Sequence, residues 1–319
     1  MILKNKKRLG VMSDTKKILI TGGTGSIGKR IVIELRNYGY SMYVLSREDI
    51  FIDDPLINFV KGNITDEKLI EKIMSDCFAV FHCAAEFKDK LKMHEVNVVG
   101  TRNIYNAICK NEIRYFCYLS SVGVIGKVLT EIVDENTLCN PMNLYEQTKL
   151  KAEQIVERGI KSGQTVILRP TNVFSEETFR IKNYRTITHC LKVLLTGKEY
   201  SHLVYANDVA RAAIHFLIYP LNTTCDKFIV SSDEESGSTS GEIDILVRKL
   251  LGHKIYLKKF FVPIEIPYIL RLLKYGRSNR GNIRYSSQHL FSKGFTMPFG
   301  LHNGLERVIK HQISLCLCV

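Results

Sequence analysis

The feature that most constrains this chain is a strand, a glycine-rich turn and a helix that follow one another near the N-terminus. Residues 16–20, KKILI, end in an apolar run that predicts a buried strand. Residues 21–28, TGGTGSIG, have glycines at positions 22, 25 and 28 and open a helix with one apolar face. Such a turn lets the backbone approach a pyrophosphate, and the helix N-terminus offers it free N–H groups. This segment therefore predicts a dinucleotide site.

Strands and helices continue to alternate along the first half of the chain. This spacing is typical of parallel βαβ units whose sheet is covered by helices on both faces. The sequence therefore predicts an α/β fold with a Rossmann-type, doubly wound parallel sheet and a smaller C-terminal substrate-binding domain. The expected strands are 42–45, 59–60, 79–83, 115–120 and 165–168, and the expected helices are 67–74, 96–111 and 144–159.

Composition and charge suggest the domain boundaries of the chain and the cellular compartment of the protein. We expect residues 1–13 to be a disordered basic extension and residues 14–175 to form the dinucleotide-binding domain, with 201–231 returning to it. Residues 176–200 and 232–319 would form the substrate-binding domain. No apolar run is long enough to span a membrane, and the nine cysteines lack metal-site spacing. We therefore expect a cytoplasmic protein with free thiols and no metal.

The formal net charge of +13 is concentrated towards the C-terminus. From Arg248 to Val319 the chain has thirteen Lys or Arg residues against two acidic ones, Glu265 and Glu306. A basic surface attracts a diphosphate substrate, a nucleic acid or an acidic membrane, although it can also be a solvated face without a partner. We expect no nucleic acid, whereas residues 260–274 have an apolar side that could lie on a membrane.

The end of the second expected strand bears on the choice of cofactor. An acidic residue there would bind the adenosine ribose of NAD, whereas an arginine would pair with the 2′-phosphate of NADP. The chain has Arg47 followed by Glu48 at this point. The sequence therefore favours NADP over NAD, with Glu48 leaving NAD open.

Further along the chain, three residues together form a candidate proton-transfer group. Tyr145 and Lys149 are four apart in an expected helix and therefore share one face. A nearby ammonium group stabilises phenolate and would lower the tyrosine pKa, so that Tyr145 could exchange a proton with an alcohol or carbonyl. Ser121 follows an expected strand and could bond the same substrate oxygen.

In their order, these segments resemble an extended short-chain dehydrogenase/reductase of the NAD-dependent epimerase/dehydratase family. The resemblance covers about residues 16 to 310. It implies an NAD(P)-dependent oxidoreductase or epimerase that acts on the sugar of a nucleotide-sugar, as a 4-epimerase or ketoreductase. The segments are TGGTGSIG (21–28), GNITD (62–66), FHCAA (81–85), NVVGT (97–101), LSSVGVIG (119–126), Tyr145 to Lys149, LRPTNVF (168–174), VYANDVA (204–210) and YSS (285–287).

The resemblance also implies a role for individual residues. Tyr145 would be the general acid/base, Lys149 would lower its pKa and hold the nicotinamide ribose, and Ser121 would orient the substrate. Asn172 would reach the substrate, and Arg277, Arg280 or Arg284 could hold its diphosphate. The residues implied for the cofactor are Gly22, Gly25, Ser26, Ile27, Gly28, Arg47, Asn63, Ile64, Cys83, Ala84, Ala85, Asn97, Tyr145, Lys149, Pro170 and Val173.

Departures from the family pattern leave the reaction open. Val122 and Gly123 stand where dehydratases of the family have an acidic pair, which disfavours dehydration. Ser201 and His202 occupy a region where some sugar epimerases have a diphosphate-binding arginine. An NADPH-dependent reductase of an apolar, steroid- or flavonol-like carbonyl and a non-catalytic dinucleotide sensor remain alternatives. A homodimer is also a family expectation.

Overall fold

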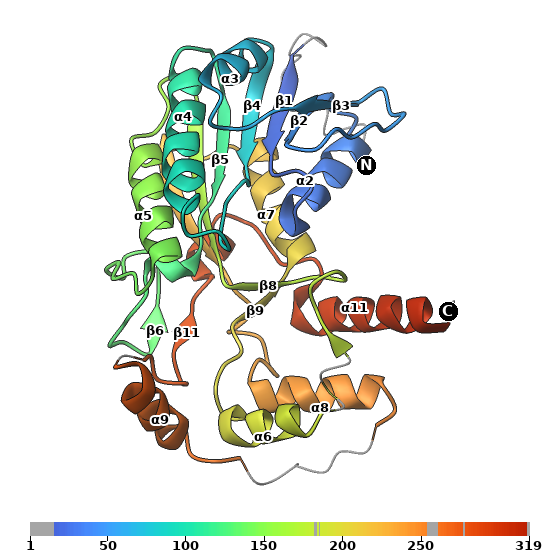
Figure 1. The fold of residues 1–319 in the computed structure, drawn as a ribbon, viewed down its shortest axis with the longest axis vertical. Helices are drawn as coiled ribbons and strands as arrows, with labels where there is room; N and C mark the ends of the chain where they lie inside the picture. The colour runs from blue at the N-terminus through green and yellow to red at the C-terminus, as the bar shows by residue number, and fades with distance from the viewer. Residues whose placement is uncertain (1–15, 182–183, 185, 254–260, 277, 318–319) are drawn as a thin grey trace. The chain divides into compact units, whose positions relative to one another are not determined.

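The computed structural model describes residues 16–181, 184, 186–253, 261–276 and 278–317, and the chain divides into two compact units (Figure 1). The first unit comprises the described residues up to Val124, Pro141–Arg169 and Val209–Phe228. The second comprises Ile125–Asn140, Pro170–Asp208 and the described chain from Ile229 onwards. The expected basic extension 1–13 lies outside the described residues.

A seven-stranded sheet forms the centre of the first unit. Its strand order is β10-β7-β5-β4-β1-β2-β3, and the neighbouring pairs from β7 to β3 are all parallel. The side chains of β4 and β5 are buried throughout, as a sheet covered on both faces requires. The strands are β1 (Lys17–Thr21), β2 (Met42–Ser46), β3 (Ile57–Lys61), β4 (Cys77–His82), β5 (Tyr115–Leu119), β7 (Gln164–Pro170) and β10 (Cys225–Val230).

Helices cover both faces of this sheet (Figure 1). One face carries α3 (Glu67–Met74), α4 (Thr101–Cys109) and α5 (Leu144–Val156), whose apolar side chains share a core with alternate strand residues. The other face carries α2 (Ser26–Asn37) and α7 (Ala206–Ile218). The expected Rossmann-type doubly wound fold is therefore confirmed. No helix within the described chain is both long and apolar enough to cross a bilayer.

The second unit has its own small core. Two short parallel ladders, β8 with β9 and β6 with β11, accompany helices α6, α8, α9, α10 and α11. The core joins β8, β9, α8 and α11 through Phe174, Tyr205, Val247 and Leu305. The bounds are β6 (Ile132–Val133), β8 (Asn172–Phe174), β9 (Leu203–Tyr205), β11 (Arg284–Tyr285), α6 (Ile187–Thr196), α8 (Ser240–Leu250), α9 (Glu265–Tyr275), α10 (Gln288–Ser292) and α11 (Gly300–Leu317).

Candidate active site

The glycine-rich turn between β1 and α2 leaves no room for side chains. Gly22 has φ +66°, and a Cβ there would come within 2.6 Å of the backbone nitrogen of Ala84. A Cβ at Gly28 would come within 2.2 Å of the Gly22 carbonyl oxygen. The turn therefore needs glycine at both positions, and its backbone lies directly against the chain that leaves β4.

The N-terminus of α2 has the properties of a phosphate site. Gly25 is its N-cap and offers no side chain to the free N–H groups of the first turn. Ser26 Oγ is buried and has no hydrogen-bond partner in the structure, and Ile27 follows it in the helix. An orphaned hydroxyl beside free helix N–H groups suits a phosphate oxygen, so these residues fit a dinucleotide.

The ends of β2 and β3 carry the residues expected near the adenosine. Arg47 is exposed after β2, and the backbone N–H of Glu48 donates to Ser46 Oγ at 3.1 Å. After β3, Asn63 is exposed and its Oδ1 accepts from the Thr65 N–H at 3.3 Å. Ile64 is buried, and its carbonyl accepts from Asn103 Nδ2 at 3.2 Å.

Asn97 has a supporting role in addition to the one expected from its motif. It is 2% exposed in the π-helix η1 (Glu95–Gly100), where a helix was expected to start at Val96. Its Oδ1 accepts from the Glu86 N–H at 2.7 Å, and its Nδ2 donates to Thr148 Oγ1 at 3.0 Å. Asn97 thereby connects the segment that contains Cys83, Ala84 and Ala85 to helix α5.

The three candidate catalytic residues lie in the first unit. Tyr145 and Lys149 are one turn apart on α5, whose N-cap Asn143 accepts from the Glu146 N–H. Ser121 follows β5, and its Oγ accepts from the Gly123 N–H at 3.1 Å. A Cβ at Gly123 would lie 3.0 Å from Glu146 Cγ and 3.3 Å from Ser121 Oγ, so the serine turn packs against the start of α5.

Lys149 is 2% exposed, and burial lowers its pKa to about 7. Its Nζ donates to the carbonyl of Leu119 and lies 4.3 Å from the centre of the Tyr118 ring. The negative charge of Glu153, one turn later on α5, opposes this shift. Lys149 can therefore change its protonation state near neutral pH.

The pKa of Tyr145 differs from the expectation. Burial raises it above the usual value of 10.0, with a further contribution from the charge of Glu146. A lowered Tyr145 pKa would require the Lys149 ammonium to lie beside the Tyr145 hydroxyl. Lys149 Nζ instead donates to the backbone carbonyl of Leu119 in β5.

The sequence reading missed a buried ion pair behind these residues. Glu153 of α5 and Arg169 of β7 are ion-paired at 0% and 1% side-chain exposure, and Ser120 Oγ donates to Glu153 Oε2 at 2.6 Å. Glu153 is four residues after Lys149 and therefore shares its helix face, a spacing that could have indicated from the sequence that Glu153 lies near the site.

His82, which was expected to have no catalytic role, is buried on β4. Its ring nitrogens lie 2.6 Å from Thr21 Oγ1 and 2.9 Å from Thr101 Oγ1, and burial lowers its pKa to about 3.

The remaining expected residues belong to the second unit. Pro170 precedes Asn172 and Val173, which are in β8, and Asn172 Nδ2 donates to the Ser201 carbonyl at 3.1 Å. Arg284 lies over the Tyr200 ring, with its guanidinium carbon 5.9 Å from the ring centre. Arg280 is exposed and lies 5.8 Å from the centre of the Tyr268 ring, whereas Arg277 lies outside the described residues.

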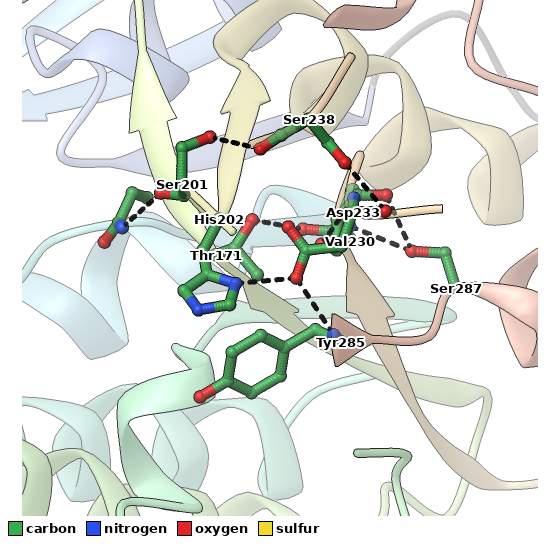
Figure 2. A network of polar contacts seen from close by, with 10 residues as sticks. Thr171, Ser201, His202, Val230, Asp233, Ser238, Tyr285 and Ser287 are labelled. Atoms are coloured by element: carbon green, nitrogen blue, oxygen red, sulfur yellow. Dashed lines mark hydrogen bonds and ion pairs between the residues drawn. The ribbon is translucent and has the colours of Figure 1, made fainter. Parts of the chain in front are cut away.

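Figure 2 shows a polar network of the second unit around His202 and Asp233. His202 Nδ1 lies 2.7 Å from Asp233 Oδ2, which also accepts from the Tyr285 N–H at 2.9 Å. His202 has φ +53°, the single non-glycine residue with positive φ in the described chain. Its carbonyl accepts from the Asn172 N–H at 2.7 Å. Sequence reasoning assigned this pair no role, because its two members are 31 residues apart.

Comparison with known proteins identifies the family. The model of the NAD dependent epimerase/dehydratase family matches residues 18–224. The chain therefore belongs to this family of the extended short-chain dehydrogenase/reductase type, and its cofactor is a nicotinamide dinucleotide.

Particular relatives match almost the whole chain. The N-acetyl-alpha-D-glucosaminyl-diphospho-ditrans,octacis-undecaprenol 4-epimerase of Escherichia coli O157:H7 is 23% identical over 92% of this chain and 95% of its own. MoeE5 in complex with UDP-glucuronic acid and NAD has a TM-score of 0.71 at 20% identity, covering 94% of this chain and 99% of its own. The UDP-glucose 4-epimerase of Thermotoga maritima has a TM-score of 0.69 at 19% identity, with the same coverage.

Proposed function

We propose that the chain is an NAD(P)-dependent epimerase or ketoreductase that acts on a sugar carbon of a nucleotide-sugar. The observation that carries the proposal is the arrangement of Ser121, Tyr145 and Lys149 in the same unit as the glycine-rich turn. Solved neighbours contain NAD with UDP-sugars, and the relatives include 4-epimerases, which supports the same class of reaction.

In this mechanism each side chain handles one part of a proton transfer. The bound nicotinamide supplies the site that accepts or returns hydride. Tyr145 Oη takes the proton from the sugar hydroxyl as the carbonyl forms and returns it in reduction. Ser121 Oγ donates to the same oxygen and stabilises its developing charge. Lys149 is bonded to the Leu119 carbonyl, so it would favour the phenolate form of Tyr145 only after leaving this bond when the dinucleotide binds.

Replacing Tyr145 by phenylalanine tests this assignment. We expect Tyr145→Phe to lower turnover by about 10²–10⁴-fold, because the proton acceptor is removed. Dinucleotide affinity should stay close to that of the wild type. Tyr219→Phe, at a 49% exposed tyrosine, is the matched control and should keep full turnover. Unchanged turnover in Tyr145→Phe would overturn the proposal.

A substrate panel distinguishes the possible reactions. The purified chain is tested for bound nicotinamide and then with UDP-, GDP- and dTDP-sugars. Interconversion without added cofactor identifies an epimerase, whereas stoichiometric NADPH consumption identifies a ketoreductase. Turnover of apolar carbonyls alone would favour the steroid- or flavonol-like alternative. Dinucleotide binding without any turnover would favour a sensor.

We infer a preference for NADP from the exposed Arg47 after β2. Its guanidinium can pair with a 2′-phosphate, which NAD lacks. Arg47→Ala should weaken NADPH binding far more than NADH binding. Lys68→Ala, which removes an exposed charge on α3, is the control. An equal loss for both cofactors would contradict this preference.

We also infer a cytoplasmic homodimer. The seven cysteines whose side chains the structure describes are free thiols, which suits a reducing compartment. Dimerisation through the helix that carries Tyr145 follows the family expectation. Sedimentation equilibrium over a range of concentrations tests it, and a monomer throughout would exclude it.

A further inference from the structure

Two short helices of the second unit expose aliphatic faces to solvent. On α6, Ile187, Leu191 and Leu195 recur every four residues and are 79%, 56% and 38% exposed. On α9 the exposed aliphatic residues follow a spacing of three and four, which also defines one helix face. The residues of this face are Ile266, Ile269, Leu270 and Leu273, and Leu273 is 79% exposed, while Leu272 and Tyr275 of α9 are exposed beside it at 36% and 62%.

These helices hold far more than their share of such residues. Nine of the twenty exposed large hydrophobic side chains in the described chain lie on α6 and α9, although the helices have only ten and eleven residues. Single exposed aliphatic residues are common on soluble proteins, but a clustered set marks an interaction surface.

The inward side of α6 makes polar contacts in addition to burying Val193, which is 4% exposed. His189 Nε2 lies 3.0 Å from Asp244 Oδ1 of α8, and the same carboxylate is paired with Arg248 at 2.7 Å. Arg248 also donates to Cys190 Sγ at 3.3 Å. Asp244 and Arg248 are only 4% and 8% exposed. The helix therefore makes ionic contacts inwards beside Val193 and turns Ile187, Leu191 and Leu195 outwards, a partial reversal of an ordinary surface helix.

Helix α9 shows the same reversal. Arg271 makes a two-pronged ion pair with Glu199, at 3.0 and 2.7 Å, and Glu199 is 8% exposed. Pro267 is buried, whereas Leu270 and Leu273 are exposed.

The two helices lie side by side. Helix α6 packs against α9, and the Val262 N–H just before α9 donates to the Leu194 carbonyl of α6 at 3.1 Å (Figure 1). We call the seven outward aliphatic residues of the two helices the α6–α9 face. They are Ile187, Leu191, Leu195, Ile266, Ile269, Leu270 and Leu273.

The charged residues around the α6–α9 face favour an anionic partner. Lys192 and Lys274 are exposed on these helices, where Glu265 is the single acidic residue. Arg271, the remaining Lys or Arg of the two helices, is paired with Glu199, so their exposed charge is positive. A second copy of the same basic surface would be repelled, whereas anionic lipid headgroups attract it and the acyl region accepts the aliphatic side chains.

We propose that the α6–α9 face docks the protein on a membrane surface that contains anionic lipids. This contact goes beyond the proposed reaction and does not depend on it. One consequence does rest on the proposed function: a docked enzyme would also meet diphosphate-linked sugars carried on lipids.

Flotation of the full-length chain with vesicles tests the docking. We expect binding to vesicles of phosphatidylcholine with phosphatidylglycerol, and weak binding to phosphatidylcholine alone. The triple variant Leu191→Ser/Leu270→Ser/Leu273→Ser should lose at least about tenfold in affinity for the anionic vesicles, since it removes aliphatic area. The matched control is Leu91→Ser/Leu129→Ser/Leu138→Ser, which changes leucines that are 93%, 96% and 87% exposed outside this face.

The charge contribution has its own variant. Lys192→Gln/Lys274→Gln should weaken binding to anionic vesicles and leave the weak binding to phosphatidylcholine unchanged. The proposal fails if the wild type ignores anionic vesicles, or if the leucine variant of the α6–α9 face still binds them. It also fails if the wild type is a dimer in sedimentation and this variant is a monomer, because a second copy then covers the face.

Turnover separates this proposal from the proposed function. No residue changed in these variants belongs to the candidate active site, so activity on a soluble nucleotide-sugar should match the wild type. Lost vesicle binding with full turnover supports the docking surface alone. Vesicle binding by a chain that turns over no sugar would leave the docking intact and refute the reaction.

Discussion

Lys149 experiences opposing influences that make the stability of the protein depend on pH. Burial lowers its pKa to about 7, while the negative charge of Glu153 acts in the other direction. In the unfolded chain a lysine has a pKa of about 10.4. Between these two values the unfolded state binds more protons than the folded state, so stability rises with pH.

We therefore expect the free energy of unfolding to increase between about pH 7 and about pH 8.5, a window that ends where unfolded thiols start to ionise. Urea unfolding at several pH values in this window measures the slope. Lys149→Met should reduce it, because the titrating amine is gone. The control is Lys151→Met, which removes an exposed lysine on the same helix. The explanation is excluded if Lys151→Met reduces the slope as much.

Gly28 offers a second test at the residue scale. A Cβ there would lie 2.2 Å from the Gly22 carbonyl oxygen, so Gly28→Ala should distort the turn and weaken dinucleotide binding more than about tenfold. Gly252→Ala is the control. Gly252 has φ +68° but open space around it, so alanine there should cost about 1–2 kcal/mol of stability without affecting the dinucleotide. Equal dinucleotide affinity in both variants would contradict this account of the turn.

At the scale of elements, the Glu153–Arg169 pair joins helix α5 to strand β7 inside the first unit. Removing one partner leaves the other charge buried without compensation, so Glu153→Leu or Arg169→Leu alone should cost about 3–5 kcal/mol. The double variant should cost less than the sum of the two single ones. Denaturant unfolding of all four proteins gives the coupling energy. Additive losses would mean that the two side chains act independently.

The pieces that sequence analysis predicted well are those whose structure is set locally. The glycine at position 28 is required by a steric contact with Gly22, six residues earlier, and the buried strands are set by their apolar runs. The Lys149 pKa was not predictable, because it depends on α5 packing against β5. The His202–Asp233 pair and the outward aliphatic faces of α6 and α9 depend on contacts between segments distant in the chain. Periodicity alone gives a helix face, but not which neighbour covers it.

At the scale of the whole molecule, the net charge of +13 should affect how an anionic substrate arrives. A diphosphate is attracted over distances of about 10 Å at an ionic strength of about 0.1 M, and over about 30 Å at about 0.01 M. We expect KM for the nucleotide-sugar to rise several-fold when the ionic strength is raised from about 0.01 M to about 0.1 M, because screening weakens association. The value of kcat should change little, because Lys149 is buried and screened far less.

Initial rates in sodium chloride measure this dependence, and an uncharged carbonyl substrate is the control. A KM that does not change with salt concentration would show that the basic residues play no part in substrate association.

A variant with Arg280→Gln and Arg284→Gln tests which residues cause the salt dependence. Arg280 is exposed and Arg284 is half-buried in the second unit. If these two arginines hold the diphosphate, their loss should raise KM and flatten its salt dependence, whereas Lys293→Gln/Lys310→Gln, at exposed lysines of the same unit, should change it less.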